Sequence, residues 1–263
     1  MCLNWIDVTA LSFNHLLLLE RVQLSWFPGW LPEEELATAL QANPVAEWYL
    51  RHKCPEIIPW LEKVLSDHST SSTHSADQVR QAELKVMGTI NDLLVYVIDP
   101  TIYDAQPFMG WDSNELRQLA DFSHKLVIDV GSGTGRLAFV AAETASVVFA
   151  VEPVPNLRRY IKQKAHAQHF NNIFPVDGLI TDLPFPAAYA DITMGGHVFG
   201  DHPRAEYAEM KRVTKPGGMI VLCPGSSLEE TKAHEFLVSQ DFRWSFFEEP
   251  QEGPKRKYWK EIE

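Results

Sequence analysis

The stretch Leu126-Val127-Ile128-Asp129-Val130-Gly131-Ser132-Gly133-Thr134-Gly135 decides the fold of this chain. Its first five residues form a short apolar run without polar–apolar alternation, which predicts a strand buried on both faces of a parallel sheet. The three glycines that follow allow a tight turn and a close approach of a ligand to the backbone, because glycine has no Cβ. The stretch therefore predicts a ligand-binding loop between a buried strand and a helix.

Alternating strands and helices follow this stretch and predict an α/β fold with a doubly wound, Rossmann-like sheet. The predicted strands cover residues 126–130, 147–151, 173–176, 190–194 and 218–222. The predicted helices cover residues 134–145, 155–169, 203–213 and 228–239. Two more strand-like runs, residues 243–248 and 257–262, flank a turn with proline and glycine and predict a closing antiparallel hairpin. In such sheets a ligand binds at the carboxyl ends of the strands.

The region before the sheet carries helical signals instead. A helix is predicted to begin near Pro32, and further helices are predicted over residues 46–52, 55–65, 76–97 and 114–120. We therefore divide the chain into an N-terminal helical extension, residues 1–121, and an α/β domain, residues 122–263. The extension is expected to cap the ligand site and to form the substrate region, because added elements over the strand ends usually supply specificity.

The composition of the chain limits the classes of molecule that it is expected to bind. The formal net charge is -12, which disfavours the broad phosphate contacts that nucleic-acid binding requires, so no nucleic-acid partner is expected. The basic run Lys255-Arg256-Lys257 is interpreted as a solvated strand edge. The apolar run Leu16–Leu19 is too short to span a membrane and is interpreted as buried packing or a loosely ordered terminus. The 3 scattered cysteines form no metal-ligand pattern, so no metal is expected, and they favour a reducing, cytoplasmic setting.

An acidic residue closes the second predicted strand. Glu152 could accept hydrogen bonds from both hydroxyls of a ribose that lies across the strand ends, and Asp129 could accept from loop amides or a ligand ammonium group. A glycine loop alone could be only a structural turn, but its place between two such acids favours a nucleoside site. Dinucleotide sites use Gly-x-Gly-x-x-Gly, and here the third glycine comes one position early.

Four stretches of the chain, between about residues 125 and 225, resemble the class I S-adenosylmethionine-dependent methyltransferases, in particular the type 11 or ubiquinone/menaquinone-biosynthesis-like group. They are Val127-Ile128-Asp129-Val130-Gly131-Ser132-Gly133-Thr134-Gly135-Arg136, Val151-Glu152-Pro153, Asp182-Leu183-Pro184-Phe185-Pro186 with Ala190-Asp191-Ile192, and Arg212-Val213-Thr214-Lys215-Pro216-Gly217-Gly218. The resemblance implies a seven-stranded sheet with an antiparallel last strand, S-adenosylmethionine as cofactor and methyl transfer as activity.

The same resemblance implies roles for individual residues. The residues that would hold the methionine part of the cofactor are Asp129, Gly131, Ser132, Gly133 and Gly135. Glu152, followed by Pro153, would hold the ribose hydroxyls. Those that would contact the adenine are Asp177, Gly178 and Leu179, although the family often has Gly-Asp-Ala closer to its Leu-Pro-Phe element than this chain does. A solvated loop acid is the alternative interpretation of Asp177.

His197 is the candidate catalytic residue, because it follows the fourth predicted strand at the end of the sheet where ligands bind. It could orient the acceptor or take a proton, and a structural histidine is the alternative. Tyr103 and Trp111 lie in an aromatic segment just before the first strand and are the candidate substrate residues. In the family this segment often folds over the methionine end of the cofactor, and a packed linker is the alternative.

The acceptor is expected to be a small molecule. The chain lacks the Asn-Pro-Pro-Tyr and Asp-Pro-Pro-Tyr tetrapeptides of enzymes that methylate base or glutamine amino groups, and its charge is strongly acidic. Two other functions stay open. One is a non-catalytic module that binds S-adenosylmethionine. The other is a nicotinamide-dependent oxidoreductase, since Glu152 lies about twenty residues beyond the first glycine, where such enzymes place a ribose-binding acid.

Overall fold

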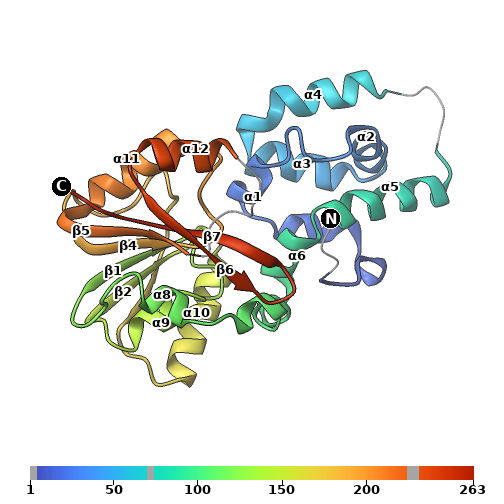
Figure 1. Ribbon diagram of the computed structural model, residues 1–263. Helices are drawn as coiled ribbons and strands as arrows, with labels where there is room; N and C mark the ends of the chain where they lie inside the picture. The colour runs from blue at the N-terminus through green and yellow to red at the C-terminus, as the bar shows by residue number, and fades with distance from the viewer. Residues whose placement is uncertain (1–4, 70–73, 224–230) are drawn as a thin grey trace. The chain divides into compact units, whose positions relative to one another are not determined.

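The computed structural model describes residues 5–69, 74–223 and 231–263 (Figure 1). It divides into two compact units, Met1–Tyr103 and Asp104–Glu263, and each is described here by itself. Residues 104–121, which the sequence groups with the N-terminal helices, belong to the second unit.

The first unit is helical. Its elements are the 3-10 helices η1 (Val8–Ala10), η2 (Phe13–Leu18) and η3 (Pro55–Ile57), and the helices α1 (Arg21–Ser25), α2 (Glu33–Ala42), α3 (Pro44–Lys53), α4 (Ile58–Asp67), α5 (Ala76–Thr89) and α6 (Asn91–Ile98), with α7 (Pro100–Asp104) at the boundary. Three glutamates stand in the first turn of α2, where the helix dipole favours negative charge. Within the run Leu16–Leu19, Leu16 and Leu19 are fully buried in the core of this unit, so buried packing is the correct interpretation of the run.

The single helix predicted over residues 76–97 is in fact two helices, α5 and α6, with a break at Ile90. Gly88 and Thr89, both weak helix formers, precede the break. Directly after it, the Asn91 side chain accepts from the N–H of Ile6 at 3.1 Å and donates to the carbonyl of Ile6 at 2.8 Å. This tertiary pairing fixes the start of α6 and overrides the helical pattern.

The second unit is built on a seven-stranded sheet with strand order β3-β2-β1-β4-β5-β7-β6 (Figure 1). Its strands are β1 (Leu126–Val130), β2 (Val147–Val151), β3 (Ile173–Val176), β4 (Ala190–Gly195), β5 (Thr214–Leu222), β6 (Arg243–Glu249) and β7 (Gly253–Glu261). The first five strands pair in parallel, and β7 is antiparallel to both β5 and β6. The predicted Rossmann-like sheet with an antiparallel last strand is confirmed.

Helices cover both faces of this sheet. Those of the unit are α8 (Asn114–Arg117), α9 (Ala138–Ala142), α10 (Pro155–Ala167), α11 (Pro203–Val213) and α12 (Lys232–Ser239), with the 3-10 helix η4 (Pro107–Gly110). One apolar cluster joins α8, α9 and α10 to one face, and a second cluster joins α11 and α12 to the other. The sheet is thus buried on both sides, as the apolar strands predict.

Several element bounds differ from the prediction, and the largest differences lie in the second unit. The helix predicted over 134–145 is reduced to α9, because the glycine loop continues as turns to residue 137. The strands β5 and β7 begin four residues earlier than predicted, at Thr214 and Gly253. The start of the helix predicted over 228–239 lies partly outside the described residues, and α12 is described from Lys232.

The interpretation of the basic run Lys255–Lys257 as a solvated strand edge is wrong. The run lies in β7, where its residues pair with Ser245–Phe247 of β6, and Arg256 and Lys257 are only 5% and 6% exposed. Lys257 forms an ion pair with Glu115, and the guanidinium of Arg256 lies 5.6 Å from the ring centroid of Trp244. The charges of Arg256 and Lys257 therefore interact with side chains inside the domain rather than with solvent.

Candidate cofactor site and the adjacent charge cluster

Glu152, at the carboxyl end of β2, is hydrogen-bonded to the glycine loop. Its Oε2 accepts from the backbone N–H of Gly133 at 2.9 Å, and its Oε1 accepts from that of Val154 at 2.9 Å. Glu152 is 5% exposed, and burial raises its pKa to about 7 although both N–H donors oppose the shift. Each carboxylate oxygen retains one acceptor position for a further donor.

Asp129, at the carboxyl end of β1, has one unsatisfied oxygen. Its Oδ2 accepts from the N–H of Ala138 at 3.1 Å, whereas the buried Oδ1 has no hydrogen-bond partner among the described residues. Burial raises the pKa of Asp129 to about 7. The hydroxyl of Thr134 is buried and unpartnered in the same sense. Since buried polar atoms are normally satisfied, these two atoms fit a ligand that brings hydrogen-bonding groups, such as an ammonium.

The backbone conformation and packing of the loop explain why two of its three glycine positions cannot hold a larger residue. Gly131 has φ 64°, and a Cβ there would lie 2.5 Å from Cγ2 of Val198. Gly135 has φ 92°, and a Cβ there would lie 2.5 Å from Cε2 of Phe139. Both glycines are therefore needed for the turn and its packing. Gly133, with φ 56°, is the glycine whose N–H holds Glu152. The hydroxyl of Ser132 donates to the backbone carbonyl of Asp129 at 2.8 Å and closes the same turn.

The residues expected at the adenine follow β3. Asp177 has a side chain that is 74% exposed, and its Oδ1 accepts from Nη1 of Arg158 at 2.8 Å. Arg158 also donates to the carbonyl of Glu152 at 2.6 Å, so it links the two predicted positions, and sequence reasoning missed it. Gly178 packs closely against Val151, and the next residue, 179, is 41% exposed. Pro153 is half-buried beside Glu152.

His197 lies in a charge cluster that was not predicted. Its Nε2 is 3.3 Å from Oε2 and 3.4 Å from Oε1 of Glu249, the last residue of β6. Glu249 also pairs with Arg136 Nη2 at 2.5 Å and, more loosely, with Lys255 Nζ at 3.7 Å. Burial raises the pKa of Glu249, but His197 and Arg136 together lower it by more than burial raises it. The net shift of this pKa is therefore downward. We call these four residues the Glu249 cluster.

The two candidate substrate residues fall in different units. Tyr103 is the last residue of the first unit, and its ring makes edge contacts with Tyr96 at 5.1 Å and Trp5 at 5.2 Å between centroids. Trp111 is 8% exposed in the second unit, and its ring centroid lies 4.8 Å from Cζ of Arg136. Trp111 therefore packs directly on the Glu249 cluster.

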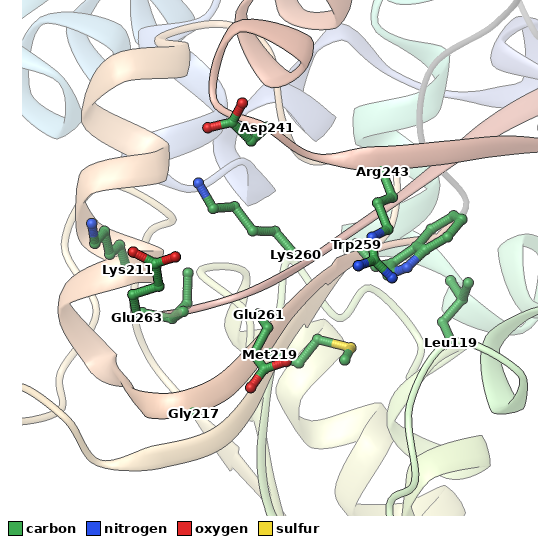
Figure 2. A pocket seen from close by; sticks show the side chains of 11 residues that line it. Leu119, Lys211, Gly217, Met219, Asp241, Arg243, Trp259, Lys260, Glu261 and Glu263 are labelled. Atoms are coloured by element: carbon green, nitrogen blue, oxygen red, sulfur yellow. The ribbon is translucent and has the colours of Figure 1, made fainter.

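A cavity of about 740 Å³ lies at the other end of the sheet (Figure 2). Gly217 and Met219, near the start of β5, line it together with Glu261 at the end of β7. The glycine loop follows the opposite, carboxyl end of the parallel strands, so this cavity is separate from the candidate cofactor site. Acidic and basic side chains both line it, among them Lys211, Asp241, Arg243, Lys260 and Glu263.

Every helix in the described residues is too short or too polar to span a membrane. Within the same residues, no group of three or more histidine, cysteine or acidic side chains is arranged to hold a metal ion.

A family model described as a methyltransferase domain matches residues 128–222. Demethylmenaquinone methyltransferase of Geobacillus kaustophilus is 32% identical over 121 residues, which are 43% of this chain and 50% of that protein. Histone-arginine methyltransferase CARMER of Culex quinquefasciatus is 33% identical over 105 residues, which are 38% of this chain and 17% of that protein. The chain thus spans half or less of the length of these relatives.

Among solved structures, a SAM-dependent methyltransferase from Aquifex aeolicus aligns with a TM-score of 0.47 and 17% identity, covering 62% of this chain and 97% of that one. The second unit has a Rossmann-like fold, with Asp129 and Glu152 at the carboxyl ends of β1 and β2. Residues 128–222, the part of the chain that matches the methyltransferase-domain model, run from β1 to the end of β5 in this unit.

Proposed function

We propose that this chain transfers the methyl group of S-adenosylmethionine to a small-molecule acceptor by in-line displacement. One observation carries the proposal. A buried carboxylate, Glu152, is hydrogen-bonded to the N–H of Gly133, beside a second buried carboxylate, Asp129, whose Oδ1 lacks a partner among the described residues. Two strand ends therefore present acceptors to one ligand.

The two carboxylates suit different parts of the cofactor. Glu152 would accept the ribose hydroxyls with the acceptor positions that Gly133 and Val154 leave open. Asp129 Oδ1 would accept from the ammonium of the methionine part, and the positive charge would favour the ionised carboxylate. The sulfonium supplies a methyl group that is already activated. Asp177, Gly178 and Leu179 are proposed for the adenine, with Arg158 holding Asp177 in place.

The remaining parts of the site are proposed from their position in the chain. Methyl transfer depends mainly on alignment and on exclusion of water, and added elements commonly provide both. We propose that the N-terminal helices form the cap and substrate region, with Tyr103 and Trp111 as candidate wall residues. His197 is proposed to act on the acceptor.

A small-molecule acceptor is supported by charge and by relatives. The net charge of -12 does not suit nucleic acid. One group of relatives is named for demethylmenaquinone, and another, from Serratia marcescens, for a malonyl group on acyl-carrier protein, with 32% identity over 124 residues. The CARMER relatives are named for histone arginine, so a histone peptide belongs among the acceptors tested.

Titration calorimetry of the full chain with S-adenosylmethionine, S-adenosylhomocysteine and NAD tests the cofactor. We expect binding of the first two and none of NAD, and preferential binding of NAD would contradict the proposal. Release of S-adenosylhomocysteine over a panel of metabolites then tests catalysis. Tight binding without any release, with the histone peptide included, would instead indicate a non-catalytic binding module.

A further inference from the structure

We infer that Glu249 positions His197 as a hydrogen-bond acceptor in the proposed methyl transfer, so that the acceptor substrate carries a hydroxyl whose proton His197 takes. This inference rests on the proposed function. It adds a positioning residue to the site and a chemical class to the acceptor. Glu249 does so from β6, outside the stretches that carry the family resemblance.

His197 lies beside the glycine loop. It comes two residues after Gly195, the end of β4, which pairs with Val130 of β1 directly before the loop. Its neighbour Val198 packs so closely on Gly131 that no Cβ would fit there. The two loops therefore contact one another at the carboxyl end of the sheet, and an imidazole at residue 197 is near the end where the cofactor is proposed to bind.

The side chain of His197 is much more exposed to solvent than those of its partner Glu249 and of Arg136. The His197 side chain is 42% exposed, whereas the side chains of Glu249 and Arg136 are 1% and 10% exposed. The guanidinium nitrogens of Arg136 are buried beneath Trp111, so they cannot meet a ligand without rearrangement. His197 is therefore the most exposed residue of the Glu249 cluster, ahead of Lys255 at 14%, and the one we infer contacts the acceptor.

Glu249 is held rigidly enough to orient a neighbour. Arg136 and Lys255 both bind its carboxylate, and Lys255 is in turn 3.4 Å from Glu252. Next to these, Lys257 pairs with Glu115.

The geometry assigns the histidine tautomer. Both distances to Glu249 run from Nε2, and a carboxylate can only accept, so Nε2 carries a proton and, in the neutral imidazole, Nδ1 carries the lone pair. No partner of Nδ1 is found among the described residues. In the transfer step, Nδ1 takes the hydroxyl proton while the acceptor oxygen bonds to the methyl carbon. The electron pair of the broken carbon–sulfur bond returns to sulfur, and the sulfonium becomes a thioether.

The test begins with the tautomer, which needs no acceptor. Nitrogen-15 NMR of the histidine side chains, with His197 assigned by its absence in His197→Gln, should show Nε2 protonated. In Glu249→Gln, Arg136 claims the amide oxygen and the amide NH₂ faces Nε2, so the proton should move to Nδ1. Glu252→Gln is the matched control and should leave the tautomer unchanged. A proton on Nδ1 in the parent protein, or an unchanged tautomer in Glu249→Gln, would overturn the inference.

The second arm tests the acceptor class with catechol, benzoate and benzylamine as probes for hydroxyl, carboxylate and amine acceptors. Transfer to catechol should fall by about 100-fold in His197→Gln, the usual contribution of a general base, with KM little changed. Transfer to benzoate or benzylamine at a rate that His197→Gln does not change would overturn the base role. Calorimetry separates the two proposals: both variants should bind S-adenosylmethionine like the parent, and a parent that fails to bind it would refute the proposed function while the tautomer result stands.

Discussion

The backbone N–H of Gly133 donates to Oε2 of Glu152 at 2.9 Å, so the glycine loop after β1 and the acid after β2 form one unit. The same carboxylate accepts from Val154 and so also fixes the start of α10. A change at Glu152 is therefore expected to affect both ligand binding and the local structure. The two effects can be separated because only one of them involves the cofactor.

Glu152→Gln should weaken S-adenosylmethionine binding by at least about tenfold, since an amide replaces a charged acceptor for two hydroxyls. It should also lower stability by about 1–3 kcal/mol, because the amide NH₂ cannot accept from one of the two buried N–H groups. Calorimetry and urea unfolding measure the two effects. Glu143→Gln, at an exposed ion pair with Arg117, is the control and should change neither. Parent-like affinity in Glu152→Gln would remove Glu152 from the site.

Asp129 should give the protein a pH-dependent stability without cofactor. Burial raises its folded pKa to about 7, above the unfolded value, so the native state holds more protons between about pH 4 and pH 7. Its contribution to stability is thus greatest at low pH and is lost as the pH rises toward 7. Relative to Asp129→Asn, the parent should become less stable between pH 5 and pH 8 in urea unfolding. A pH-independent difference would show that Asp129 titrates normally.

Gly135→Ala should destabilise the domain by more than Gly217→Ala. Both glycines have positive φ, 92° and 74°, so both substitutions carry backbone strain. Only at Gly135 would the new methyl overlap a neighbour, the ring of Phe139, whereas nothing lies within 4 Å at Gly217. The difference should be about 1–3 kcal/mol in denaturant unfolding. Equal losses would mean that Phe139 moves aside freely.

Trp111→Ala should lower stability by about 3–5 kcal/mol, as is usual for truncation of a buried aromatic. Trp111 packs on Arg136 and, edge-on at 6.1 Å, on Phe247, so the variant would also uncover the Glu249 cluster. Trp111→Phe keeps an aromatic face and should retain most of the stability. Thermal unfolding of the two variants measures this. An Ala variant as stable as the parent but defective in turnover would indicate a wall residue instead.

The sequence was most informative where local pattern and burial coincide. The strands at residues 126–130, 147–151 and 173–176 have the predicted bounds, because unbroken apolar runs between turn residues specify buried parallel strands. The helix after the glycine loop was predicted too long, since the positive φ of Gly133 and Gly135 prolongs the turn. The pattern of apolar and polar residues does not show which glycines adopt a positive φ.

The Glu249 cluster could not be predicted from local pattern. Arg136 follows the glycine loop and Glu249 ends β6, so their contact depends on the register of the whole hairpin against the sheet. The basic run was misread for the same reason. Lys257 looks like a solvated residue in sequence. The insertion of β7 between β5 and β6 brings its strand into the sheet, where Lys257 pairs with Ser245 of β6 and forms an ion pair with Glu115.

That insertion also has a consequence for the order of folding. In the strand order, β6 joins the sheet through β7, although β6 comes first along the chain. The two strands can pair locally as a hairpin, but the hairpin joins the sheet only when β7 docks on β5, and such non-local closure is slow compared with helix formation. Until it occurs, Glu249 has no fixed place, and neither Arg136 nor His197 has its partner. The cofactor loop can thus form early, whereas the groups proposed to act on the acceptor come together only in the last steps, and a partly folded chain could hold the methyl donor without being able to use it.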